Sequence, residues 1–94
     1  MKTRVNNRVQ TWFSSEARFP GASAVVSILD ISISGCRMKT DEKSARIGTT
    51  IVLQLADNHY ASGEIVRKVG TNFGVHFHRP VGDVNIDQIA ARLE

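Results

Sequence analysis

Residues 9–29 read VQTWFSSEARFPGASAVVSIL and contain two extended segments joined by a turn. In the first, Val9, Phe13, Ala17 and Phe19 fall on one parity, whereas Gln10, Ser14, Glu16 and Arg18 fall on the other. This period of two is typical of a strand with one buried face, and only Trp12 interrupts it. Pro20-Gly21 marks a turn, and the apolar, β-branched run from Ala24 to Leu29 predicts a second strand. We expect the two strands to pair as an antiparallel hairpin.

The rest of the chain continues the strand pattern. We expect strands, in order along the chain, at Cys36–Thr40, Thr49–Ala56, His59–Val69 and Phe73–Phe77. The connections between them are a solvated loop at Asp41–Ser44, a turn at Asp57-Asn58 and a reversal at Gly70-Thr71-Asn72. Almost every predicted element is therefore a strand.

The last segment changes period. Ile86, Ile89, Ala90 and Leu93 recur at helical spacing, and Asn85 with Gln88 resembles a capping pair. Five or six strands and a terminal helix within 94 residues predict a mostly β fold. We expect one domain over residues 1–94, a small antiparallel six-stranded β-barrel with a C-terminal α-helix at residues 85–93. Residues 1–8 are expected to form a flexible N-terminal arm.

Composition limits the classes of partner. The chain carries a net charge of +3, which favours an anionic ligand but is too mild for a dedicated nucleic-acid binder. Its N-terminal sequence has no apolar leader, and no run approaches the roughly 18 apolar residues of a membrane span. We therefore expect a cytoplasmic protein without membrane insertion.

Metal and disulfide chemistry are not expected. Cys36 is the only cysteine, which excludes an intramolecular disulfide and a thiolate cluster within one chain. His76 and His78 share one strand face, but two ligands are too few for a metal site, and we expect both to face solvent. The sequence predicts no metal and no cofactor.

Two short motifs carry the residues best suited to ligand binding. Arg4 and Arg8 are four positions apart, and 21 residues separate Arg8 from the segment Asp30-Ile31-Ser32-Ile33-Ser34-Gly35. Guanidinium groups recognise guanine edges as planar forks and also bind phosphates. The second segment offers a carboxylate, a hydroxyl and backbone N–H groups. Together the motifs indicate guanine-nucleotide binding.

Strand parity suggests how the second motif would work. In an extended chain Ile31 and Ile33 point to one side and anchor in the core, so Asp30 and Ser32 are expected to face outward. Asp30 would accept from guanine N–H groups or orient an arginine, and Ser32 would donate to a phosphate oxygen. Gly35 would permit a positive φ and close backbone approach. Taken alone, the segment is also typical of a turn that connects two strands. The two arginines, taken alone, are also typical of a solvated basic tail.

The joint pattern RxxxR followed by [D/N]xSxxG resembles the PilZ domain, a bacterial receptor module for cyclic di-GMP. All its defining positions are present, namely Arg4, Arg8, Asp30, Ser32 and Gly35. The resemblance implies that these residues bind cyclic di-GMP and that binding folds the arm over the barrel. It also implies signalling to a partner protein that controls motility, biofilm formation or virulence. One position departs, because Ser34 occupies a place where the family often has glycine.

Several alternatives remain open. No nucleophile and base pair, catalytic carboxylate pair or phosphate-binding glycine loop can be assembled, so we do not expect an enzyme. The alternative functions are those of a ligand-independent PilZ-type adaptor and of a small nucleic-acid-binding barrel. Two interpretations of Arg37 remain, namely a further contact to a phosphate and a solvated side chain. Cys36 is expected to be a buried strand residue. Trp12 is expected to pack in the core or at the barrel rim, and the alternative is that it stacks on a base.

Overall fold

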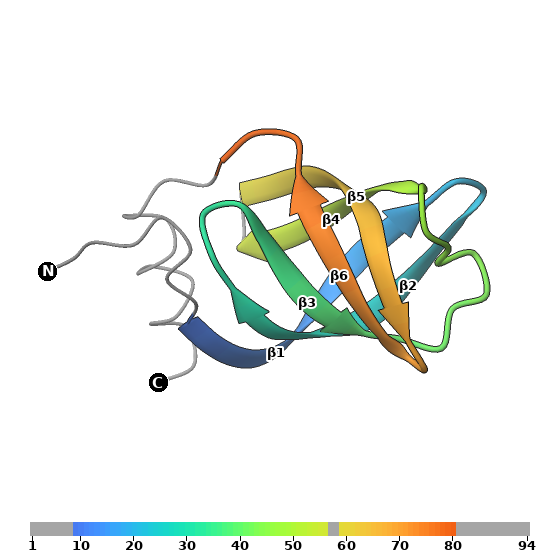
Figure 1. Ribbon diagram of the computed structural model, residues 1–94, viewed down its shortest axis with the longest axis horizontal. Coiled ribbons are helices and arrows are strands. Elements are labelled where there is room, and N and C mark those ends of the chain that lie inside the picture. The colour runs from blue at the N-terminus through green and yellow to red at the C-terminus, as the bar shows by residue number, and fades with distance from the viewer. Residues whose placement is uncertain (1–8, 57–58, 81–94) are drawn as a thin grey trace, which may run out of the picture.

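The structure is a computed structural model that describes residues 9–56 and 59–80, with side chains described from residue 12. Six strands make up its regular structure: β1 (Val9–Phe19), β2 (Ala22–Ile31), β3 (Gly35–Lys39), β4 (Thr50–Ala56), β5 (His59–Val69) and β6 (Asn72–Phe77). They form a closed barrel in the order β1-β2-β3-β6-β5-β4, with every pairing antiparallel (Figure 1). The predicted six-stranded barrel is confirmed.

The barrel consists of two three-stranded meanders, β1-β2-β3 and β4-β5-β6, joined along two seams. One seam pairs β3 with β6 over five residue pairs, and the other pairs β1 with β4. Each strand is paired on both sides, and the β1–β4 seam that closes the barrel comprises two register pairs. The predicted arm at residues 1–8, the turn at Asp57-Asn58 and the helix at residues 85–93 lie outside the described residues.

Alternating side chains fill the interior. In β4, every second residue from Ile51 to Leu55 is buried, as the period of two predicts. Cys36 is 1% exposed and belongs to the same core, which confirms its expected burial. A buried polar residue, Ser15 of β1, donates its hydroxyl to the backbone oxygen of Gln54 in β4 and so reinforces the second seam. No helix within the described residues is long and apolar enough to cross a membrane.

Two irregularities interrupt the ladders on either side of β2. Between β1 and β2 the register shifts between Gln10 and Phe13, and between β2 and β3 it shifts between Ile28 and Asp30. Trp12 lies in the first bulge with a φ of 51°, which explains why it breaks the alternation of β1. Both shifts lie next to the polar motif at the end of β2.

Candidate functional site

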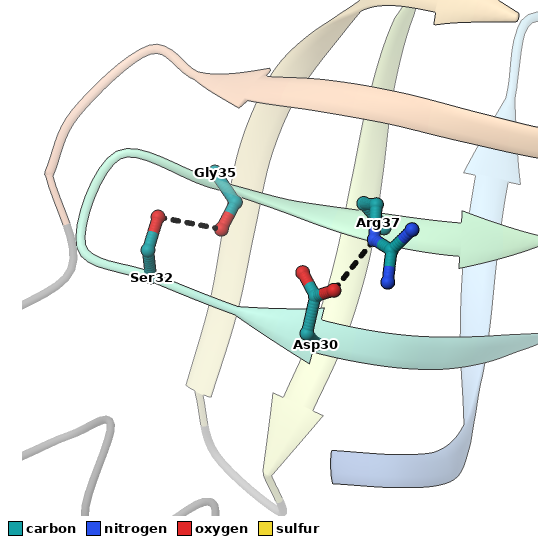
Figure 2. Close-up of polar contacts among 4 residues, drawn as sticks. All are labelled: Asp30, Ser32, Gly35 and Arg37. Atoms are coloured by element: carbon teal, nitrogen blue, oxygen red, sulfur yellow. Dashed lines mark hydrogen bonds and ion pairs between the residues drawn. The ribbon is translucent and has the colours of Figure 1, made fainter. Parts of the chain in front are cut away.

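The turn between β2 and β3 is closed by Ser32. Its backbone N–H donates to the backbone oxygen of Gly35 at 2.8 Å. Its hydroxyl donates to the same oxygen at 3.3 Å (Figure 2). The hydroxyl oxygens of Ser32 and Ser34 are 3.4 Å apart. Ser32 is 0% exposed, so its side chain is part of the turn itself. The serine of the motif therefore builds the hairpin in this structure.

Gly35 is required by the close packing of β3 against β6. A Cβ at this position would lie 2.1 Å from the backbone oxygen of Val75, far inside van der Waals contact. The expected positive φ is wrong, because Gly35 is not among the positive-φ residues. On the other side of β6, a Cβ on Gly63 would lie 2.7 Å from the backbone oxygen of His76. Two glycines thus let the neighbouring strands approach the end of β6.

The burial of the motif is only partly as expected. Ile31 is 0% exposed and Ile33 packs against the core, which confirms the apolar half of the parity prediction. Asp30 lies on the same face as its register partner Arg37, but the expectation of an exposed polar pair is wrong, because Asp30 and Ser32 are 4% and 0% exposed. The physical reason is that the bulge and the tight turn place both side chains against neighbouring groups of the hairpin, where hydrogen bonds stabilise them.

Arg37 is the partner of Asp30 across the hairpin. Its Nε donates to Oδ2 of Asp30 at 2.5 Å, while its side chain stays 53% exposed (Figure 2). The two residues are direct register partners of β2 and β3. Sequence reasoning weighed Arg37 as a phosphate contact or a solvated side chain and missed this pair. Folding the turn into a hairpin and counting outward from it would have found the pair.

The Asp30–Arg37 pair belongs to a row of register partners that crosses five strands. Gln10 of β1 pairs with Asp30, Asp30 with Arg37, Arg37 with Gly74 of β6, and Gly74 with Arg67 of β5. Directly paired residues have Cα atoms about 4.5–5.5 Å apart. The row therefore sets two arginines on either side of a glycine that has no side chain to fill the space between them.

A cavity of about 430 Å³ lies at this place on the β3-β6-β5 wall of the barrel. Arg37, Gly74, Arg67 and His76 line it together with Val66 and Val69, and Ser34 and Gly35 connect it to the motif turn. None of the described residues that line it is acidic. A cavity of this size with cationic and apolar walls suits a small, anionic ligand with flat rings.

The sequence candidates are distributed as follows. Asp30, Ser32 and Gly35 come together in the β2–β3 hairpin, whereas Arg4 and Arg8 lie outside the described residues. His76 and His78 are exposed, as expected. The hydroxyl of Ser62 lies 3.1 Å from Nδ1 of His78. The described residues contain no cluster of three or more His, Cys, Asp or Glu able to hold a metal ion. The expected packing of Trp12 is wrong, because its residue surface is 68% exposed.

Comparison with known proteins identifies similar chains. A sequence model of the PilZ domain matches residues 2–94. The Borreliella burgdorferi PlzA protein, solved in complex with c-di-GMP, superposes with a TM-score of 0.68 at 13% sequence identity, over 94% of this chain and 41% of that one. The present chain thus spans about two fifths of PlzA.

A second solved structure, the uncharacterized Legionella protein Lpg0364, superposes with a TM-score of 0.54 at 18% identity, over 93% of this chain and 89% of that one. At such identities these similarities establish the fold. No curated protein matches the chain.

Proposed function

Because this chain belongs to the PilZ domain family, we propose that it is a bacterial, cytoplasmic receptor for cyclic di-GMP and not an enzyme. The observation that carries the proposal is the row of register partners Asp30, Arg37, Gly74 and Arg67 beside the motif turn. Its two arginines and the cavity between them match a ligand with two phosphates and two guanines. PlzA, which has a similar fold, was solved with this dinucleotide.

The geometry favours one of the two roles considered for Asp30. Since the side chain of Asp30 is 5% exposed and its carboxylate accepts from Arg37, it acts by orienting guanidinium groups more readily than by touching guanine directly. Nε of Arg37 is held by Asp30, so the terminal Nη groups are the ones left to reach a phosphate or a guanine edge. Ser32 and Gly35 serve the site by fixing the hairpin that carries this pair.

Arg4 and Arg8 complete the proposed site. Arg8 precedes Gln10 by two residues, so covalent geometry keeps its Cα within about 7 Å of the β1 end of the row. The guanidinium group of Arg8, together with that of Arg4 on the same arm, would enclose the ligand from the side opposite Arg67. On binding, the arm at residues 1–8 would change conformation and alter the surface offered to a partner protein that controls motility, biofilm formation or virulence.

Titration calorimetry with cyclic di-GMP tests the assignment. We expect the wild type to bind, and Arg8→Ala and Asp30→Ala each to weaken binding at least about tenfold, because each loses charge-assisted hydrogen bonds. Arg18→Ala is the matched control, since it removes one exposed cation on the β1–β4 side of the barrel and leaves the row intact.

The outcomes separate clearly. Absence of heat with the wild type would refute the receptor function. Equal affinity of the wild type, Arg8→Ala and Asp30→Ala would refute the site. A loss of affinity in Arg18→Ala as large as in Arg8→Ala would show that net charge, and not the site, governs binding.

A further inference from the structure

Trp12 has an unfavourable backbone conformation for its residue type. Its φ of 51° makes it the one non-glycine residue with positive φ among those described. A Cβ clashes with the following carbonyl oxygen in this region, so any residue other than glycine costs free energy there. Such strain persists where the surrounding structure imposes it, and it gathers at functional sites.

Packing does not offset this cost. Trp12 is 68% exposed, whereas Phe19, Phe73 and Phe77 are at most 5% exposed. Glycine would adopt the same φ without strain and would sacrifice little buried area. The bulge therefore presents a large, flat side chain to solvent at the expense of stability.

The position of Trp12 links it to the proposed binding row. The bulge lies between Gln10 and Phe13 of β1, and Gln10 is the register partner of Asp30. Trp12 thus follows the first residue of the row by two positions. Arg37 lies on β3, two strand spacings from β1, which is roughly 10 Å. A single cyclic dinucleotide can span that distance.

We propose that the indole of Trp12 stacks on a guanine of the bound dinucleotide. Indole and purine faces attract each other through dispersion and burial of apolar surface, and base stacking on aromatic side chains contributes substantially to nucleotide affinity. The arginines on the row hold phosphates and guanine edges, while Trp12 supplies the flat surface that they lack. The inference rests on the proposed binding of cyclic di-GMP.

The chain has a single tryptophan, so its intrinsic fluorescence reports on Trp12 alone. Titration of the wild type with cyclic di-GMP is expected to change the emission with the same Kd that calorimetry gives. The bound ligand is also expected to protect the indole from quenching by acrylamide. Absence of both changes in a protein that binds by calorimetry would overturn the stacking.

Two variants complete the test. Trp12→Gly is expected to bind at least about fivefold more weakly than wild type while its Tm stays equal or rises, because strain is relieved. Trp12→Phe keeps an aromatic ring, so its affinity for cyclic di-GMP is expected to lie between those of the wild type and Trp12→Gly.

If Trp12→Gly binds as tightly as wild type while Asp30→Ala does not bind, the receptor function stands and the stacking is refuted. If the wild type itself fails to bind, both are refuted.

Discussion

The two hairpins that meet in the candidate site are built in different ways. The β5–β6 hairpin reverses at Gly70-Thr71 through a positive φ of 62°, and a Cβ on Gly70 would touch nothing within 4 Å. The β2–β3 hairpin reverses through Ser32 to Gly35, with a buried serine and a glycine pressed against the backbone of β6. One turn is determined by local chain conformation, the other by tertiary contacts.

This difference gives a physical reason for placing Asp30 and Arg37 of the proposed site on the β2–β3 hairpin. A turn made by local conformation stays open to solvent and gives its side chains freedom. A turn packed against another strand holds its polar groups in one geometry, as the Asp30–Arg37 pair shows. Preorganised groups lose little entropy on binding, so the packed hairpin is the better place for a ligand site.

The largest contrast between the hairpins is expected at their glycines. Gly35→Ala should destabilise the protein by more than about 4 kcal/mol, because its Cβ meets the backbone of β6 and the strands have to separate. Gly70→Ala should cost only about 1–2 kcal/mol, the strain of a side chain at positive φ. Urea unfolding measures both. Equal losses would contradict the distinction between the two turns.

The next contrast concerns one side-chain pair from each hairpin. A double-mutant cycle on Asp30 and Arg37 should give a coupling of about 1 kcal/mol, limited by the exposure of Arg37. A cycle on Lys68→Ala and Phe73→Leu should give at most about 0.5 kcal/mol, because Lys68 is exposed and its Nζ lies 5.8 Å from the ring centroid. Thermal unfolding of the single and double variants provides both values, and a stronger Lys68–Phe73 coupling would reverse the comparison.

The smallest contrast is between two hydroxyls. Ser32→Ala should cost about 0.5–1 kcal/mol, since the buried 3.3 Å hydrogen bond to Gly35 is lost while the backbone bond remains. Thr71→Ala, at an exposed position in the other turn, should change stability by less than about 0.5 kcal/mol. Chemical denaturation resolves the two, and a larger loss in Thr71→Ala would show that the exposed turn is the more constrained one.

The sequence predicted the barrel well because its strands alternate with a period of two and the turns at Pro20-Gly21 and Gly70-Thr71 carry glycine. The strand limits agree to within two residues, and β1 and β5 agree at both ends. Local pattern does not contain the contact between Gly35 and Val75, which joins strands far apart in the sequence. The reason for that glycine, and the burial of Asp30, therefore emerged only from the fold.

The candidate site was predicted in part for the same reason. Asp30, Ser32 and Gly35 stand out as a motif, but Arg37 and Arg67 do not. Arg67 joins the row only through the pairing of Gly74 with both β3 and β5. Trp12 was noticed because it breaks the period of β1, yet its exposure depends on a bulge that no residue pattern specifies.

The location of bound cyclic di-GMP is the most direct test of the account, and amide chemical shifts in solution measure it. We predict that addition of the dinucleotide shifts the signals of Asp30, Arg37 and Gly74, while those of Ala17 and Leu53 at the β1–β4 seam stay unchanged. Unchanged spectra, or shifts concentrated at that seam, would contradict the assignment of the site to the row.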